Sequence, residues 1–261
     1  MTRLLRMSVP VLIDAPKSMA GSTKAVLSGE YDCGLFGERL TIADIGANVG
    51  AFSVWATARW PGSTVTAYEP HPDTFEMLRR NVAALGNVAT VNAAVYPTAD
   101  DSISFYARYA GDGEAGVALC SKGTFGKVPN RQRFNVPALH PKKVPAADVV
   151  KIDAEGSEAE IVRHLDLSDT SLVLIEFQHD VNRGTIKQLL QPRFDLLLEE
   201  EFSWDPLLGD EYRPSLAGDH YGHLFFTAKR GSKLRPPPAE TRAQPSWRSI
   251  ASEIVQKFRG R

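Results

Sequence analysis

A run of seven residues from Asp44 to Gly50 has the residue types of a turn that binds a small ligand. Gly46 and Gly50 let the backbone approach a ligand closely, and Asp44 can order backbone amides or receive a cationic amino group. The run lacks the Gly-x-Gly-x-x-Gly spacing of NAD-binding turns. The turn therefore suits a ligand that carries an ammonium group and no pyrophosphate.

Two polar residues further along the chain follow the ends of predicted strands. Glu69 lies about twenty residues after the turn, where doubly wound folds keep an acid that binds ribose hydroxyls. Asn92 follows the next predicted strand and is a candidate for facing an adenine ring. Each residue alone also fits ordinary packing or solvation. At consecutive strand ends, together with the turn, they indicate an adenosine-containing cofactor.

Four motifs carry a resemblance to a known family. They are the turn at 44–50, Tyr68-Glu69-Pro70, Asn92-Ala93-Ala94 and, most specifically, residues 150–158, which read Val-Lys-Ile-Asp-Ala-Glu-Gly-Ser-Glu. Over about residues 29 to 177 the chain resembles the FkbM-type methyltransferases. The resemblance implies a class I methyltransferase fold, S-adenosylmethionine as methyl donor with S-adenosylhomocysteine as product, and oxygen methylation of a hydroxyl on a sugar or natural-product-like small molecule. The candidate cofactor-binding residues are Asp44, Gly46, Asn48, Gly50, Phe52, Glu69, Asn92 and Asp153.

The candidate catalytic residues are Asp153, Glu176 and His179, at or just after the ends of two predicted strands. Methyl transfer needs an aligned acceptor and, for a poorly ionised hydroxyl, a general base. Asp153 either fixes the cofactor or acceptor, or caps a helix expected from Glu155 to Leu165. His179 is the candidate base because histidine titrates near neutrality, although a loop histidine can equally be a bystander. Lys151, in an otherwise apolar strand, is expected to pair with Asp153 or another buried acid.

The same residues are also compatible with other chemistries. Asp153, Glu176 and His179 could hold a divalent metal that orients acceptor oxygens, but their spacing does not decide this and no metal ligand is predicted. An NAD-linked oxidoreductase is disfavoured by the glycine spacing. A non-catalytic nucleotide-binding protein with the same fold is the other alternative.

The elements that position these residues alternate along the chain between β-prone runs and helical patterns, which is typical of a parallel sheet covered on both faces. The last two β-prone runs have no convincing helix between them and indicate a closing antiparallel pair. The sequence therefore predicts an α/β, doubly wound, Rossmann-like sheet of seven mostly parallel strands with an antiparallel C-terminal edge pair. The β-prone runs are 40–44, 64–68, 88–91, 148–153, 172–177, 194–198 and 223–227, and the helical patterns are 52–58, 72–86, 155–165 and 181–190.

The predicted S-adenosylmethionine-binding domain spans residues 38–230, after an extension at 1–37. Residues 98–145 depart from the alternation and are interpreted as an insertion, either a lid whose lysines and arginines favour an acidic acceptor or a solvated loop. Residues 231–261 are predicted to form a Pro-rich linker and an amphipathic helix. Its apolar stripe fits docking on the same domain or on a second subunit, so a homo-oligomer stays open, whereas membrane contact is disfavoured.

Composition narrows the range of partners. The chain has 30 basic and 31 acidic residues and a formal net charge of −1, which argues against a nucleic-acid partner. Two cysteines and the lack of a long apolar run predict a cytoplasmic protein. The expected partner is a small-molecule or glycan acceptor.

Overall fold

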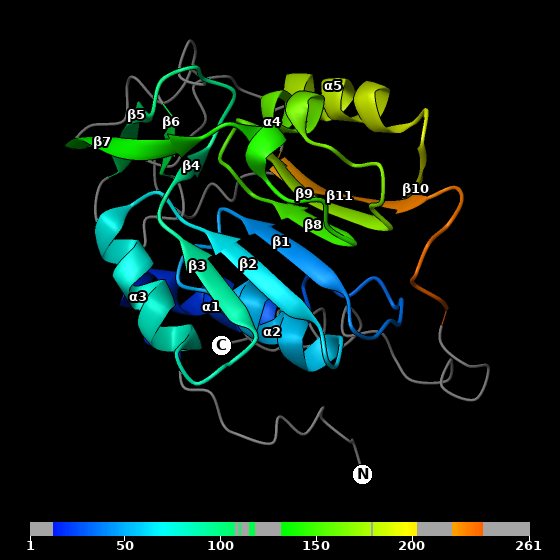
Figure 1. Cartoon of the computed structure of the whole chain (residues 1–261), viewed down its shortest axis with the longest axis horizontal. Coiled ribbons are helices and arrows are strands. Elements are labelled where there is room, and N and C mark those ends of the chain that lie inside the picture. The colour runs from blue at the N-terminus through cyan, green and yellow to red at the C-terminus, as the bar shows by residue number, and fades with distance from the viewer. Residues whose placement is uncertain are drawn as a thin grey trace, which may run out of the picture.

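The computed structural model describes most of the chain (Figure 1). The described residues are 13–107, 110, 115–117, 132–178, 180–202 and 221–236. The predicted C-terminal helix and the candidate base His179 lie outside them. No helix in the described ranges has both the length and the apolar character needed to cross a bilayer.

A seven-stranded sheet forms the centre of the molecule (Figure 1). Its strands are β1 (Thr41–Ile45), β2 (Thr64–Tyr68), β3 (Val88–Val91), β8 (Val149–Ile152), β9 (Leu172–Gln178), β10 (Phe194–Phe202) and β11 (Tyr221–Ala228). They are arranged in the order β10-β11-β9-β8-β1-β2-β3. Neighbours from β9 to β3 are parallel, whereas β11 runs antiparallel to both β9 and β10. The predicted mostly parallel sheet with a closing antiparallel pair is confirmed.

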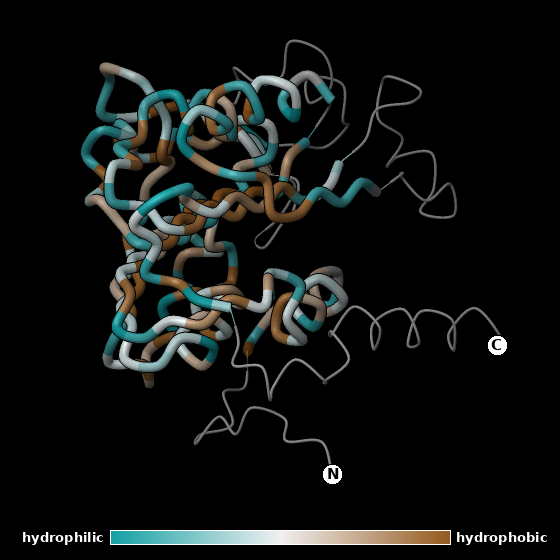
Figure 2. Tube along the Cα trace, turned by 90° about the vertical axis from the view of Figure 1, so that its right-hand side faces the viewer, coloured by the Kyte–Doolittle hydropathy of each residue, from teal (hydrophilic) through white to brown (hydrophobic). Residues whose placement is uncertain are grey.

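Helices cover both faces of this sheet because successive strand residues point to opposite sides. Ile42 of β1 packs with Trp55 of α2 (Ala51–Arg59), whereas Ile45 of the same strand packs with Ile161 of α4 (Glu158–His164). The core cluster of Ile161 also contains residues of α5 (Asp180–Leu190), and α3 (Pro72–Val82) packs against α2. Figure 2 shows hydrophobic residues concentrated along the strands between these helices.

The N-terminal segment packs on the face that α2 covers. It contains η1 (Lys17–Met19) and α1 (Ala20–Leu27), and α1 contacts α2. Tyr31 is buried in the same core cluster as Leu234 from the other end of the described chain. Phe36 and Arg235 exchange two backbone hydrogen bonds of 2.8 Å. The segment predicted as an extension thus contributes to the core of the domain.

The segment predicted as an insertion contains most of a second, smaller sheet. Its strands are β4 (Ala94–Val95), β5 (Ser102–Ala107), β6 (Gly116–Val117) and β7 (Gln132–Leu139), in the order β4-β7-β5-β6, and β7 is followed by η4 (Pro141–Lys143). Phe105 and Val136 belong to a core cluster of this sheet. In Figure 1 the second sheet lies beside the carboxyl ends of β1, β2 and β3.

The helix predicted from Glu155 begins only at Glu158, where α4 starts with Ser157 as its N-cap residue. Residues 153–157 form a loop, in which Glu155 and Gly156 have φ values of 50° and 98°. These left-handed values do not fit an α-helix. The alternative interpretation of Asp153 as the cap of this helix was therefore wrong.

Candidate functional site

The turn after β1 is built from alternating left-handed residues. Gly46, Asn48 and Gly50 have φ values of 75°, 47° and 90°. A Cβ atom on Gly46 would overlap the carbonyl oxygen of Asp153, so only glycine fits at this position. The turn consequently brings the ends of β1 and β8 into direct contact.

Glu69, directly after β2, holds this turn in place. Its Oε2 accepts a hydrogen bond of 3.0 Å from the backbone N–H of Asn48, and its Oε1 accepts one of 2.8 Å from that of His71. Burial raises the pKa of Glu69 to about 7, although the two N–H donors act in the opposite direction. Each carboxylate oxygen retains a second lone pair, so Glu69 can still accept hydrogen bonds from ligand hydroxyls.

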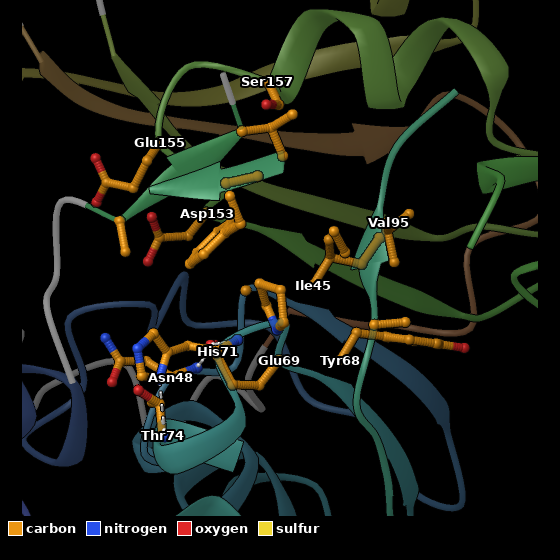
Figure 3. Close-up of a pocket in the computed structure, with 18 residues that line it drawn as sticks. Ile45, Asn48, Tyr68, Glu69, His71, Thr74, Val95, Asp153, Glu155 and Ser157 are labelled. Carbon is orange, nitrogen blue, oxygen red and sulfur yellow. Dashed lines mark hydrogen bonds between the residues drawn. The ribbon is translucent and has the colours of Figure 1, made fainter. Parts of the chain in front are cut away.

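A cavity lies between the carboxyl ends of β1, β2 and β8 and the second sheet (Figure 3). It contains about 630 Å³ of space between atoms, including its open mouth. Four of the predicted site residues line it, namely Gly46, Asn48, Glu69 and Asp153. The second sheet contributes the apolar side chains of Phe105 and Val117. The cavity thus has a polar wall on the main sheet and an apolar wall opposite.

Two other predicted residues support the turn without lining the cavity. Asp44 is fully buried, and its Oδ2 accepts a hydrogen bond of 2.7 Å from the hydroxyl of Ser53. Gly50 precedes α2, and a Cβ there would lie 2.7 Å from Cδ1 of Leu78. Neither residue is part of the cavity wall. Their contribution to the site is indirect, through the backbone of the turn.

Phe52 and Asn92 also lie outside the cavity wall. Phe52 is buried on the α2 side of the sheet, edge-on to Tyr31 with 5.2 Å between ring centroids. Asn92 donates hydrogen bonds from Nδ2 to the carbonyl oxygens of Glu69 and Pro70, at 2.8 Å and 3.0 Å. The Asn92 side chain thereby fixes the chain that leaves β2.

Lys151 links the turn to the loop after β8. Its Nζ donates a hydrogen bond of 2.7 Å to the carbonyl oxygen of Gly46 and lies 3.4 Å from both Asp44 Oδ1 and Asp153 Oδ2. Burial would lower the pKa of Lys151, but Asp153, Asp44 and Glu176 raise it above its ordinary value. The expected pairing of Lys151 with Asp153 or another buried acid is confirmed, because it pairs with both.

Asp153 is half-buried at the end of β8 and lines the cavity. In Figure 3 its carboxylate and that of Glu155 project toward the same side of the cavity. Burial raises the pKa of Asp153 to about 7 although Lys151 lowers it, and the negative charge of Glu176 adds to the rise. Asp153 can therefore gain or lose a proton near neutral pH.

Glu176 belongs to a neighbouring cluster centred on His223 of β11. Its Oε2 accepts a hydrogen bond of 3.3 Å from the hydroxyl of Tyr31 and lies 3.7 Å from Nε2 of His223. Nε2 is also 3.9 Å from Oε1 of Glu30, and Nδ1 is 3.5 Å from Oε2 of Glu200. The cluster joins the N-terminal segment to β9, β10 and β11.

The charged groups of this cluster shift one another's pKa values. Burial would lower the pKa of His223, but Glu176, Glu200 and Glu30 raise it to about 10. Burial would raise the pKa of Glu176, but His223, Lys151 and Tyr31 lower it below its ordinary value. Burial raises the pKa of Glu30 to about 7 against the opposing charge of His223. His223 is thus a cation that keeps Glu176 ionised.

The three predicted catalytic residues are brought together only in part. Asp153 lines the cavity, Glu176 lies in the cluster of His223, and His179 is outside the described residues. Within the described ranges, no group of three or more histidine, cysteine, aspartate or glutamate side chains is arranged to hold a metal ion.

The cavity wall fits the expected cofactor, S-adenosylmethionine. The Oδ1 atom of Asn48 is buried and has no hydrogen-bond partner among the described residues, so it is available to an ammonium group. Glu69 offers carboxylate lone pairs to ribose hydroxyls, and Phe105 and Val117 provide an apolar surface for a flat ring. These features match the groups that the cofactor presents.

Comparisons with known proteins agree with this geometry. The family model described as Methyltransferase FkbM domain matches residues 44–203. Methyltransferase 1 of Beauveria bassiana is 27% identical over 215 residues, which cover 67% of this chain and 80% of that protein. Hexuronic acid methyltransferase AglP of Haloferax volcanii is 28% identical over 151 residues, which cover 56% of this chain and 59% of that protein.

Solved structures also resemble this chain. A precorrin-6y C5,15-methyltransferase from Geobacter metallireducens aligns with a TM-score of 0.46 and 15% identity, over 85% of this chain and 99% of that chain. The strand order of the main sheet, with β11 inserted antiparallel between β9 and β10, is that of the class I methyltransferase fold. S-adenosylmethionine is the methyl donor. Because the family model covers more than half of the sequence, the chain belongs to the FkbM methyltransferase family.

Proposed function

We propose that this methyltransferase transfers the methyl group of S-adenosylmethionine to a hydroxyl group of a sugar-like small molecule. The observation that carries the proposal is the position of Asp153, whose carboxylate lies in the cavity wall beside the turn at Gly46. Its pKa is raised to about 7 by burial. A general base is most effective when its pKa is close to the working pH, so Asp153 suits the deprotonation of a hydroxyl.

The residues of the polar wall would hold the donor. Glu69 would accept hydrogen bonds from the ribose hydroxyls, and Asn48 Oδ1 would accept one from the ammonium group. When bound, S-adenosylmethionine supplies a methyl group made electrophilic by its sulfonium. Phe105 and Val117 would exclude water from the opposite side of the cavity.

Asp153 would then take the hydroxyl proton during transfer. As the bond between the acceptor oxygen and the methyl carbon forms and the bond from that carbon to sulfur breaks, the proton moves to the Asp153 carboxylate. Lys151, 3.4 Å from Asp153 Oδ2, fixes the position of this carboxylate. Positioning of the acceptor supplies much of the remaining acceleration.

A sugar acceptor is supported by one relative in particular. The Haloferax volcanii protein is named a hexuronic acid methyltransferase and is 28% identical over its aligned part. A sugar acid would also agree with the lysines and arginines between residues 98 and 145. We therefore propose a glycan or sugar-like acceptor, acidic in character, and no nucleic-acid partner.

The test is incubation of the chain with methyl-labelled S-adenosylmethionine and a panel of hexoses and hexuronic acids. We expect label in a methyl ether, which resists alkali. Label released by mild alkali would mean a methyl ester on a carboxylate and would contradict hydroxyl methylation. Calorimetry with S-adenosylhomocysteine checks the donor site independently of any acceptor.

Asp153→Asn provides the matched variant for the proposed base. We expect kcat to fall by about 10² to 10⁴, the usual contribution of general-base catalysis. The Kd for S-adenosylhomocysteine should change by no more than about threefold, which is under 1 kcal/mol. Full activity in Asp153→Asn would exclude Asp153 as the base.

A further inference from the structure

The loop between β8 and α4 contains a strained residue in the cavity wall. Glu155 has a φ of 50°, a left-handed value that residues other than glycine and asparagine rarely adopt. Such a conformation persists only where neighbouring groups fix it. Asp153, Glu155 and Ser157 of this loop all line the cavity. The groups that hold the loop therefore also set the shape of one cavity wall.

The buried carboxylate of Glu158 binds the backbone N–H groups of the residues before and after the strained residue. Its Oε1 accepts hydrogen bonds from the backbone N–H of Ala154 at 3.1 Å and of Gly156 at 2.8 Å. The side chain is 0% exposed although it belongs to the first turn of α4. A buried carboxylate is costly to the fold unless its oxygens are hydrogen-bonded, so these contacts are the reason that Glu158 can occupy this position.

Asn182 of α5 braces Glu158 from the other side. Its Nδ2 donates to Glu158 Oε2 at 3.2 Å and to the carbonyl oxygens of Gly156 and Gln178 at 3.0 Å and 3.1 Å. Opposite, a Cβ atom on Gly116 of β6 would lie 3.2 Å from the carbonyl oxygen of Glu155. The loop is thus enclosed between α5 and the second sheet.

We propose that Glu158 is a positioning residue for the methyl donor. By binding the backbone N–H groups of Ala154 and Gly156, it keeps Glu155 left-handed. It thereby fixes the whole wall that this loop gives to the donor cavity, which Asp153, Glu155 and Ser157 form together. Glu158 itself does not line the cavity, so it acts through the loop. The inference rests on the assignment of the cavity to S-adenosylmethionine.

The first measurement is calorimetric binding of S-adenosylhomocysteine to Glu158→Gln. A glutamine keeps one oxygen but turns an NH₂ group toward the NH₂ group of Asn182, which weakens the brace. We expect a Kd about tenfold higher, as for the loss of one hydrogen bond. Glu160→Gln is the matched control, because Glu160 lies in the same turn and its carboxylate pairs with Arg163 at the surface.

The second measurement separates positioning from general stabilisation of the fold. Glycine adopts left-handed φ without strain, whereas alanine does not. Both Glu155→Gly and Glu155→Ala remove the Glu155 side chain. In the Glu158→Gln background we expect Glu155→Gly to bind S-adenosylhomocysteine about threefold or more tighter than Glu155→Ala, and the difference should exceed that in the wild-type background.

The outcomes are decisive in each case. Wild-type affinity in Glu158→Gln, or a loss that Glu155→Gly does not reduce relative to Glu155→Ala, would overturn the inference. If Glu158→Gln does not fold, Asn182→Ala replaces it with the same expectations, because it removes the contacts that hold Glu158 and Gly156 from outside and leaves Glu158 itself in place. Failure of the wild-type chain to bind S-adenosylhomocysteine would instead overturn the donor assignment on which the inference rests.

Discussion

The Glu69 side chain connects the cofactor turn to His71, the residue before α3. Glu69→Gln replaces one carboxylate oxygen by an NH₂ group, which must face a backbone N–H of either Asn48 or His71. We expect the Kd for S-adenosylhomocysteine to rise about tenfold or more, because a charged acceptor in the site is lost. Calorimetry measures the change. Glu76→Gln, an exposed position on α3, should leave the affinity unaltered.

The buried ion pairs of Lys151 lead to a prediction about stability rather than binding. Lys151→Met keeps the length of the side chain but leaves the buried carboxylate of Asp44 without its counter-charge. Breaking one partner of a buried ion pair costs about 3–5 kcal/mol of unfolding free energy. Urea denaturation should detect this loss, whereas Lys24→Met on the exposed side of α1 should change the unfolding free energy by less than about 0.5 kcal/mol.

At the scale of residues, the sequence identified several side chains that line the cavity, but it missed most of the cluster centred on His223. Gly46 and Asn48 were identified from the turn, and Glu69 and Asp153 from the ends of predicted strands. All four line the cavity. Glu30, Tyr31 and His223 were not identified. They meet only because β11 pairs with β9 in a register that places His223 opposite Glu176, and no local pattern encodes that register.

At the scale of elements, α5 contains a glycine whose substitution should stabilise the helix. Gly184 lies on its exposed side, and an added Cβ atom would meet nothing within 4 Å. Gly184→Ala should therefore raise the unfolding free energy by about 0.5–1 kcal/mol, because alanine loses less backbone entropy on forming a helix. Thermal denaturation measures this gain. Gly46→Ala should have the opposite effect, since its Cβ would overlap the carbonyl oxygen of Asp153.

The accuracy of the predicted elements followed the strength of their local patterns. The run at 88–91 corresponds to β3 residue for residue, and the helical pattern at 181–190 differs from α5 by one residue. The start of α4 was wrong because a glutamate in a left-handed conformation has no sequence signature. The two-residue strands β4 and β6 were not predicted, since they are too short to show alternation.

At the scale of the whole molecule, buried titratable groups link stability to pH. The folded state keeps a proton on His223, whose pKa is raised to about 10, while the unfolded state releases it near the ordinary value of 6.5. The stability that this gives is full below pH 6.5 and is lost as the pH rises through 10. Burial raises the pKa of Glu69 to about 7 and that of Glu158 to about 8, which also favours the folded state at lower pH.

The melting temperature should consequently fall as the pH rises from about 5 to about 9. Differential scanning calorimetry across this range measures the slope. His223→Gln should flatten it above pH 7, because the proton difference at this position disappears. His140→Gln is the control: the pKa of this half-buried histidine lies below its ordinary value, so it contributes no slope above pH 7. An unchanged slope in His223→Gln would contradict the role assigned to this cation.

The pairing of Phe36 with Arg235 has a consequence for how the chain can be rearranged. Their mutual backbone hydrogen bonds place the two flanks of the domain side by side, at the opposite end of the strands β1 and β8 from the cavity. Adjacent ends of this kind tolerate joining by a short linker. A circularly permuted domain should therefore fold and keep its donor site intact, provided that its linker runs from the chain after Arg235 back to the start of η1 and so retains α1 and Tyr31.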